Sequence, residues 1–364
     1  MKNCLTVNYE NKPAYNIVFE PDYNKLPELL CTLEAKSRKI MIVTECNVGK
    51  YYLDEVKAVL SSVTDAVYDF VFPAGEASKN LDTVSLCYEK LIKEGFDRND
   101  FLLALGGGVV GDLTGFIAAT YLRGIRFIQL PTSLLSMVDS SIGGKTGVDF
   151  KAYKNMVGAF YQPKLVYMNL TTLNTLQERE YLSGMGEIIK HGLIKDASYY
   201  FWLKDNSEKI LQKDYEVIKE MIYQSCLIKK EVVERDPKEK GERALLNFGH
   251  TIGHSLEKLM NFSMLHGECV SVGIAAASYL SMKRGFIKIS EWEDILSTLE
   301  LFRLPVFVLN LNKEEVYEVT KLDKKMDSAK IRFILLNTIG NAVIDPTVSK
   351  EEMSNAIHSV VREM

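Results

Sequence analysis

Residues 101–112 have the sequence FLLALGGGVVGD, an apolar run followed at once by a glycine-rich turn. The apolar run predicts a strand buried on both faces, and residues 109–120 continue as a helix. Glycine lets the backbone approach a phosphate closely, and the first turn of the helix offers N–H groups to it. The segment therefore suits the pyrophosphate of a dinucleotide. Taken alone, it suits equally well a tight turn that packs a helix onto a sheet.

The segments around this unit repeat the alternation of strand and helix. Short apolar runs predict strands at residues 39–44, 66–71 and 126–130, and helical periodicity predicts helices at 48–62 and 78–95. This order indicates a parallel sheet with helices on both faces. Beyond about residue 176 the pattern becomes mainly helical, with predicted helices at 178–195, 198–212, 214–235, 249–260, 267–284 and 289–300 and one hairpin within 332–344.

Length and composition indicate a two-domain globular protein. A chain of 364 residues exceeds what one hydrophobic core usually supports, so we predict domains at 1–176 and 177–364. The net charge of −4 excludes a general basic surface for nucleic acid. The longest apolar stretch, residues 101–119, contains five glycines and Asp112 and cannot be a membrane span. We therefore expect no nucleic-acid partner and no membrane partner.

Cysteine usage and the first residues favour a cytoplasmic location. The six cysteines are dispersed and form no C-x-x-C pair, which is typical of thiols in a reducing compartment. Residues 1–15 lack the apolar run of a signal peptide.

The histidines suggest a metal site. Three of the five histidines lie within residues 250–266, and a lone structural histidine is a weaker explanation for such a cluster. His250 and His254 are four residues apart and share one helix face, His266 follows, and Glu187 lies in the motif MGEIIKH. One carboxylate and two imidazoles suit a divalent zinc ion with open positions for substrate. The spacing suggests His250 and His254 as a pair but leaves open which two of the three histidines bind.

Cations accompany the glycine-rich and apolar segments. Lysine and arginine together suit a small substrate that carries both a carboxylate and a phosphate, and the candidates are Arg123, Lys145, Lys151, Lys154, Lys190, Lys229 and Arg243. A single surface lysine is normally just solvated, but Lys190 follows Glu187 by three residues and shares its helix face. Glu45, just past the first predicted strand, suits a ribose hydroxyl; the alternative is a solvated loop acid.

Several long motifs, in one order along nearly the whole chain, resemble the 3-dehydroquinate synthase family. They are GGGVVGDLTGF at 106–116, ATYLRG at 119–124, PTSLLSMVDSSIGGKTG at 131–147, KNMVGAFYQP at 154–163, EIIKHG at 187–192 and RALLNFGHTIGH at 243–254. Six such motifs are far more specific than one glycine-rich turn.

The resemblance implies an α/β fold with an N-terminal Rossmann-like parallel-sheet domain that binds NAD and a mainly α-helical C-terminal metal-binding domain. It implies conversion of 3-deoxy-D-arabino-heptulosonate 7-phosphate to 3-dehydroquinate and phosphate, a step of the shikimate pathway toward chorismate and the aromatic amino acids. The steps are transient oxidation by NAD, phosphate elimination, re-reduction and intramolecular aldol closure. NAD and one divalent metal, zinc or cobalt, are the implied cofactors, and a homodimer is the implied assembly.

The resemblance also assigns residues. The implied metal ligands are Glu187, His250 and His266. The implied substrate residues are Asp139, Lys145, Lys154, Asn155, Lys190, Lys229, Arg243, Asn247 and His254, with Arg123 from a neighbouring subunit and one of Lys324 and Lys325, here taken as Lys325. The implied NAD residues are Glu45, Glu76, Lys79, Gly106, Gly107, Gly108, Val109, Asp112, Thr132, Ser133, Lys145, Lys154, Thr172 and Thr175.

Four positions depart from the family's commonest pattern: Glu45 replaces Asp, Ser133 replaces Thr, Asp149 replaces Asn and Gly186 replaces Ala. These changes concern fine NAD geometry rather than the reaction. Three other functions remain open: a cyclase for sedoheptulose 7-phosphate or glucose 6-phosphate, which lack the carboxylate; a dehydrogenase of the glycerol-dehydrogenase type; and a non-catalytic nucleotide-binding protein.

Overall fold

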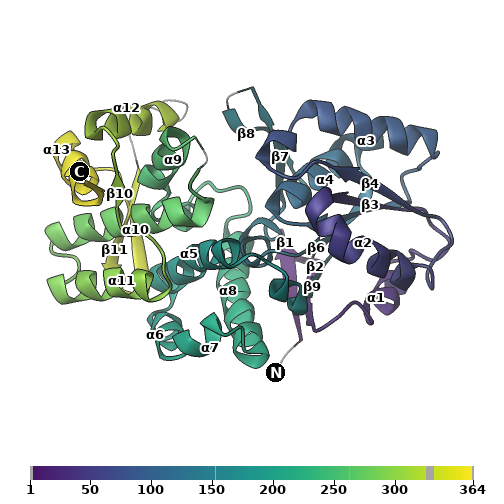
Figure 1. Ribbon diagram of the computed structural model, residues 1–364, viewed down its shortest axis with the longest axis horizontal. Helices are drawn as coiled ribbons and strands as arrows, with labels where there is room; N and C mark the ends of the chain where they lie inside the picture. Colours follow the sequence, from purple (N-terminus) through teal and green to yellow (C-terminus); the bar gives the residue numbers. More distant parts are fainter. Residues whose placement is uncertain (1–2, 152, 262, 325–331, 363–364) are drawn as a thin grey trace. The chain divides into compact units, whose positions relative to one another are not determined.

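The structure is a computed structural model and describes residues 3–151, 153–261, 263–324 and 332–362. It divides into two compact units, Met1–Leu176 and Gln177–Met364. The two units are described separately below (Figure 1).

The first unit is built on a seven-stranded sheet. From edge to edge its strands are β1 (Cys4–Tyr9), β2 (Lys12–Glu20), β9 (Leu165–Asn169), β6 (Arg126–Pro131), β5 (Phe101–Gly106), β3 (Ile40–Glu45) and β4 (Val67–Phe72). Every neighbouring pair is parallel except β1 and β2. All residues of β5 are buried, as a strand covered by helices on both faces requires. The predicted parallel sheet is confirmed.

The antiparallel edge formed by β1 and β2 was not predicted. Glu10 and Asn11 connect the two strands, and both have positive φ angles, 50° and 62°. Two left-handed residues in a two-residue connection match the right-handed twist of a hairpin. Because glutamate is uncommon in turns of this type, the sequence alone did not predict the hairpin.

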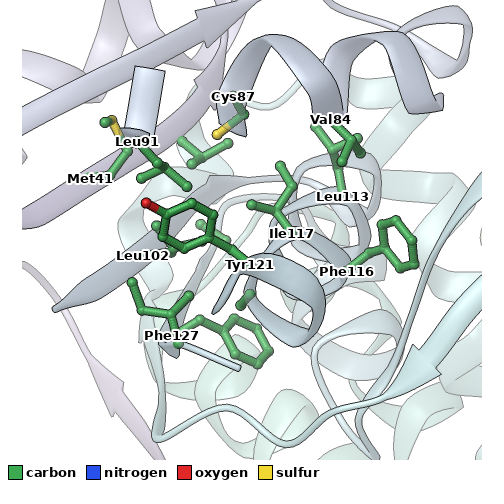
Figure 2. Close-up of a cluster of buried hydrophobic side chains, with 14 of the residues drawn as sticks. Met41, Val84, Cys87, Leu91, Leu102, Leu113, Phe116, Ile117, Tyr121 and Phe127 are labelled. Atoms are coloured by element: carbon green, nitrogen blue, oxygen red, sulfur yellow. The ribbon is translucent and has the colours of Figure 1, made fainter. Parts of the chain in front are cut away.

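Helices cover both faces of this sheet, and the alternation along β3 shows how. Met41 and Val43 pack with α3 (Leu81–Lys93) and α4 (Gly108–Thr120), as Figure 2 shows for Met41. Ile40 and Ile42 point to the other face and pack with α1 (Leu26–Thr32) and α2 (Cys46–Leu60). Burying one leucine or isoleucine contributes about 1.5–3 kcal/mol. These two cores hold the carboxyl end of β5, and with it the glycine-rich turn, in a fixed place.

A short π-helical turn, Ser136–Ser140, and a hairpin follow β6. The hairpin pairs β7 (Lys145–Phe150) with β8 (Tyr153–Phe160), and β7 packs against α4. Gly143 and Gly144, with φ angles of 95° and 66°, form the turn that leads into it. Lys145 and Lys154 therefore lie on two paired strands.

The second unit is mainly helical. Its helices are α5 (Glu178–Lys195), α6 (Ala197–Asp205), α7 (Ser207–Leu211), α8 (Tyr215–Arg235), α9 (His250–Leu259), α10 (His266–Lys283), α11 (Ile289–Leu301), α12 (Lys313–Lys324) and α13 (Lys350–Val360). Two small sheets join them, β11 (Phe333–Thr338) with β12 (Asn341–Asp345), and β10 (Val308–Leu309) with β13 (Val361–Arg362). Helix α10 is the central element and packs against α5, α9, α11 and α13.

One predicted helix is wrong. Residues 198–212 form two helices, α6 and α7, with Asn206 between them in a non-helical conformation. The side chain of Asn206 donates a hydrogen bond to the carbonyl of Trp202, 2.9 Å away. An asparagine side chain competes in this way with the hydrogen bonds of the helical backbone. The helical spacing of apolar residues therefore continues past Asn206, although the helix is interrupted there.

The structure describes all six cysteines and joins none of them in a disulfide. Across the described ranges, no helix has both the length and the apolar character that crossing a membrane demands.

Candidate metal and cofactor sites

Three side chains from three helices of the second unit meet at one point. Glu187 lies in the middle of α5, and His250 and His266 are the first residues of α9 and α10. One ligand atom from each lies within 4.8 Å of the others. Glu187 Oε1 is 3.5 Å from His250 Nε2 and 3.6 Å from His266 Nε2. A carboxylate and two imidazoles at this spacing are a donor set for a divalent ion such as zinc.

Direct backbone packing brings α5 and α10 together. A Cβ atom on Gly267 would lie 1.8 Å from the carbonyl oxygen of Ser183, so only glycine fits there. The Gly267 N–H also donates to Ser183 Oγ, 3.1 Å away. A Cβ atom on Gly186 would lie 2.7 Å from Gly267 O. The departure from alanine at position 186 thus lies at this helix contact, whereas the sequence suggested an effect on NAD geometry.

The two oxygens of Glu187 have different surroundings. Oε2 forms an ion pair with Lys190, one turn further along α5, and both side chains are buried. Oε1 is buried and has no hydrogen-bond partner among the described residues. Burial by itself raises the pKa of Glu187, but the charge of Lys190 and the two nearby imidazoles outweigh it and hold the pKa well below its usual range. An ionised, buried oxygen without a donor is what a metal ligand looks like before its ion binds.

The two imidazoles differ as well. Burial lowers the pKa of His250 well below its ordinary value, and its Nδ1 lies 3.2 Å from Phe248 O. A neutral ring that donates from Nδ1 keeps the Nε2 lone pair for a metal. His266 lies between two carboxylates, with Nδ1 3.5 Å from Glu257 Oε2. Burial lowers its pKa, but Glu187 and Glu257 outweigh burial and raise it to about 10. A divalent ion at His266 Nε2 would replace a proton.

A second possible metal-binding group shares His266. His254, Glu257 and His266 also offer atoms within 4.8 Å of one another. His254 is exposed, and its ring centroid lies 5.1 Å from that of His250. The i, i+4 spacing suggested these two histidines as a pair. The structure instead groups His250 with Glu187 and His266, and His254 with the second set.

The remaining implied substrate residues of the second unit are largely buried. Lys229 lies on α8, and Arg243 is buried at the start of the short helical segment Glu242–Asn247. An Arg243 guanidinium nitrogen donates to Pro237 O, 2.6 Å away, and Asn247 Nδ2 donates to Glu239 Oε1, 2.8 Å away. Lys325 lies outside the described residues, as does the side chain of Lys324.

In the first unit, five of the implied residues make two sets of polar contacts, one around Lys79 and one between Lys154 and Glu76. Lys79 is only 4% exposed, and its Nζ lies 2.7 Å from Asp112 Oδ2 and 2.5 Å from Asn155 Oδ1. Lys154 Nζ lies 3.5 Å from Glu76 Oε1. Burial lowers the pKa of Lys79, but Asp112 and Glu76 outweigh it and raise the pKa. Burial also raises the pKa of Asp112 in spite of the lysine.

The glycine-rich turn lies where the sequence placed it. Gly106 ends β5, Gly107 precedes α4, and Gly108 and Val109 begin that helix. A Cβ atom on Gly107 would lie 3.5 Å from Ser133 Oγ. The turn and the segment just after β6, which contains Thr132 and Ser133, are thus close in space. This is the edge of a parallel sheet at which nucleotides commonly bind.

Glu45 has a structural role in this structure. Its carboxylate accepts hydrogen bonds from the backbone N–H groups of Asn47 and Val48, at 2.6 and 2.8 Å, and so caps α2. The cap and a ribose hydroxyl would compete for the same carboxylate oxygens of Glu45.

Two further implied NAD residues, Thr172 and Thr175, lie near Tyr52. Thr175 Oγ1 lies 2.5 Å from the hydroxyl of Tyr52, whose oxygen is 3.4 Å from Thr172 O.

Asp139, Lys145 and Arg123 complete the implied substrate residues of the first unit. Asp139 lies in the π-helical turn, Lys145 is exposed at the start of β7, and Arg123 is exposed. Arg123 and the preceding Leu122 have positive φ angles of 65° and 51°, which orient this short segment in an uncommon way.

Two family models match the chain: 3-dehydroquinate synthase N-terminal, over residues 69–183, and 3-dehydroquinate synthase C-terminal, over residues 184–326. The curated 3-dehydroquinate synthase of Acetivibrio thermocellus is 44% identical over 350 residues, which cover 96% of this chain and 96% of the relative. That of Nitrosospira multiformis is 43% identical over 348 residues, covering 94% and 95%. The chain belongs to the 3-dehydroquinate synthase family.

The fold of this 3-dehydroquinate synthase family member extends to other sugar-phosphate cyclases. The structure of 2-epi-5-epi-valiolone synthase from Streptomyces hygroscopicus, with NAD+ and Zn2+ bound, has a TM-score of 0.87 at 27% identity, covering 98% of this chain and 99% of that one. A 2-deoxy-scyllo-inosose synthase with carbaglucose-6-phosphate, NAD+ and Co2+ has a TM-score of 0.88 at 22% identity, covering 98% and 100%. The second shows the fold alone.

Sequence reasoning missed Glu257 and Ser183. Glu257 follows His250 by seven residues, a spacing that returns a helix to the same face, so this signal was present in HTIGHSLE. Ser183 precedes Glu187 by four residues on α5 and contacts α10. No local pattern identifies that contact.

Proposed function

We propose that this chain converts 3-deoxy-D-arabino-heptulosonate 7-phosphate to 3-dehydroquinate and phosphate, as an NAD- and metal-dependent carbon–oxygen lyase. Membership of the family supports the reaction. The observation that carries the proposal in this chain is the buried Oε1 of Glu187, which faces two imidazoles and has no hydrogen-bond partner among the described residues. The pathway step would be that of the shikimate route to aromatic amino acids, and we expect a cytoplasmic location.

Glu187, His250 and His266 would hold one zinc or cobalt ion. When bound, the ion supplies a Lewis acid and NAD accepts and returns a hydride, so NAD is not consumed. The protein positions the substrate. Lys190 pairs with Oε2 of Glu187, and the other oxygen of the same carboxylate faces the metal site, so Lys190 would keep that carboxylate ionised. Its ammonium would also face substrate oxygens.

Cationic side chains of the β7–β8 hairpin would bind the phosphate group of the substrate. Lys145 and Lys154, with Asn155, come from its two strands, and Arg123 would join them from the second copy of a homodimer. Lys154 is already balanced by Glu76 at 3.5 Å, so the phosphate would take over that charge contact. The bound phosphate can then accept the proton that leaves the carbon next to the oxidised position.

The carboxylate and hydroxyl groups of the substrate would be positioned by cations and amides of the second unit. These residues are Lys229, Arg243, Asn247 and His254, with one lysine of the 324–325 pair. Asp139 would help to steer removal of the proton from the hydroxyl that is oxidised. The NAD site would comprise the glycine-rich turn and the other implied residues of the first unit, Glu45, Glu76, Lys79, Asp112, Thr132, Ser133, Thr172 and Thr175, with Lys145 and Lys154 shared.

The rival functions differ in what they release. A cyclase for a sugar phosphate without a carboxylate would not need the set of residues that suits a carboxylate, which is Lys229, Arg243, Asn247 and His254. A dehydrogenase would reduce NAD in proportion to turnover. The fold does not separate these functions, because the butanol dehydrogenase A of Thermotoga maritima has a TM-score of 0.71 at 15% identity, covering 98% of this chain and 99% of that one.

The deciding experiment measures phosphate release from the heptulosonate phosphate with trace NAD and one equivalent of Zn2+ or Co2+. We expect phosphate in large molar excess over NAD and no net NADH. Sedoheptulose 7-phosphate and glucose 6-phosphate, run in parallel, should release none. Stoichiometric NADH would indicate a dehydrogenase, and release from a carboxylate-free sugar alone would indicate another cyclase.

A further inference from the structure

Glu257 is a buried carboxylate that touches the candidate metal site without belonging to its three ligands. It lies on α9, two turns after His250, and is 8% exposed. Its Oε2 is 3.5 Å from Nδ1 of His266, the first residue of α10. Helix α9 therefore supplies one proposed ligand, His250, and contacts a second, His266, on the ring nitrogen that faces away from Glu187.

The geometry of His266 separates the roles of its two ring nitrogens. Nε2 faces Glu187 Oε1 at 3.6 Å, and Nδ1 faces Glu257 Oε2 at 3.5 Å. The atoms that converge with His250 are thus on the Nε2 side, where an ion would bind. The Nδ1 side is left for a hydrogen bond to Glu257.

A carboxylate behind a metal-binding histidine fixes the tautomer and the ring orientation and makes the ligating nitrogen more basic. We propose that Glu257 is a positioning residue for His266, which holds its Nδ1 proton and aims Nε2 at the ion. The inference rests on the proposed metal site. It adds a fourth residue to the function of that site, acting through His266 rather than on the ion.

The backbone of His266 is held independently of its ring. The adjacent Gly267 contacts Ser183 of α5 through its N–H and through direct backbone packing. This contact sets where α10 begins, but it leaves rotation of the imidazole about its side-chain bonds unconstrained. Glu257 contacts the ring on its Nδ1 side from α9, so ring orientation and helix position have separate supports.

The competing role for Glu257 is that of a ligand, in the set with His254 and His266. Two observations disfavour it. The Glu187 set contains a buried acceptor with no partner among the described residues, which an ion would satisfy. His254, by contrast, is exposed, so a site built on it would lie against solvent.

The test titrates the metal-stripped full chain with Co2+ and compares wild type with Glu257→Gln and Glu257→Ala. Glutamine keeps an acceptor for Nδ1–H but loses the charge, and alanine loses both. We expect Co2+ affinity to fall about 10–100-fold in Glu257→Gln and further in Glu257→Ala, with one equivalent still bound. The visible absorption of bound Co2+ should change in both. Glu231→Gln is the matched control, because Glu231 is exposed on α8; it should match wild type.

Three results would overturn the inference. Wild-type Co2+ affinity and spectrum in Glu257→Gln would leave no positioning role. A lower melting temperature of the stripped variant with unchanged affinity would make Glu257 merely structural. Loss of all binding in Glu257→Gln, while Glu187→Gln keeps one equivalent, would make it a ligand of the second set.

A milder variant serves if the Glu257 variants above do not fold, and the proposed function can be tested separately from the inference. Glu257→Asp keeps the charge at a shorter reach; should the larger changes prevent folding, its affinity and spectrum decide by the same criteria. If wild type releases no phosphate yet Glu257→Gln weakens Co2+ binding, the function fails and the inference stands. If wild type turns over normally and Glu257→Gln binds Co2+ unchanged, the inference fails and the function stands.

Discussion

The ammonium of Lys79 lies 2.7 Å from a carboxylate oxygen of Asp112, and the same ammonium donates to the side chain of Asn155. The lysine follows a short helical segment, the aspartate is on α4 and the asparagine is on β8. One buried cation therefore connects the helix that begins at the glycine-rich turn with the hairpin that carries Lys145 and Lys154. The proposed NAD and phosphate residues share this connection.

Replacing this cation should destabilise the protein. In Lys79→Met the partly buried Asp112 keeps its desolvation without its partner, so we expect the free energy of unfolding to fall by about 1–3 kcal/mol. Urea unfolding measures the change. Lys321→Met is the control, because Lys321 pairs with the exposed Glu318 on α12, and we expect a change within about 0.5 kcal/mol. Equal effects in the two variants would refute a structural role for the Lys79 pair.

Removing one imidazole should remove the metal. His250→Gln takes away the Nε2 atom that faces Glu187 at 3.5 Å without changing the net charge of a neutral ring. After dialysis against a chelator and then against Zn2+, elemental analysis should find the ion in wild type and not in the variant, and turnover should be lost. His358→Gln, on α13, is the control and should bind zinc normally. Full zinc content in His250→Gln would exclude His250 as a ligand.

The contact between α5 and α10 admits no side chain. Gly267→Ala would place a carbon 1.8 Å from Ser183 O, so the helices must separate. We expect a loss of about 1–3 kcal/mol in the free energy of unfolding, and weaker Co2+ binding because Glu187 and His266 move apart. Gly49→Ala, in α2, has its nearest neighbour at 3.4 Å and should stabilise by up to about 1 kcal/mol. A stable, metal-binding Gly267→Ala protein would contradict this account of the packing.

Lys154 should matter more for phosphate than for NAD. Lys154→Gln removes a positive charge from β8, and we expect the rate of phosphate release to fall about 100-fold, since stabilising the departing anion is its proposed task. NAD affinity, measured by fluorescence or calorimetry, should change much less. Lys93→Gln removes an exposed charge from the last turn of α3 and should leave the rate unchanged. An elimination rate that survives in Lys154→Gln would argue against the assignment.

Arg284 should make stability depend on acid. It bonds Glu352 and Asp345, and its hydrogen bond lowers the pKa of Glu352 to about 2, with help from Ser349. A carboxyl whose pKa is lower in the folded state stabilises fully above its ordinary pKa of 4.5 and loses that contribution as pH falls toward 2.

Thermal unfolding of Arg284→Gln tests this link. At pH 7 we expect a loss of about 1–2 kcal/mol. The difference from wild type should shrink steadily as pH falls from 4.5 toward 2, because in this range the unfolded wild-type chain binds a proton at Glu352 more readily than the folded protein does. Arg235→Gln, at an exposed pair on α8, should show no such convergence. A gap that stays constant down to pH 3 would mean that Arg284 acts through packing alone.

Local patterns were sufficient for most elements, since periodicity is a property of neighbouring residues. The predicted range 178–195 coincides with α5, and 101–105 is β5 without its last glycine. The pattern failed where a single residue overrides it. Asn206 interrupts one helix through its own hydrogen bond, and the Glu10–Asn11 turn adds an antiparallel edge without a familiar turn sequence.

The chain order of the motifs was enough to identify the family and to propose its residues. Folding alone decided which of these side chains meet. Glu187 and His266 are 79 positions apart in the printed sequence and approach because two helices pack backbone to backbone at Gly267. Glu257 likewise contacts the site only because α9 packs against α10; the periodicity of the sequence predicts only that its helix face is buried. Residue spacing describes one helix at a time, whereas a ligand set depends on the distances between helices, and these are set by packing.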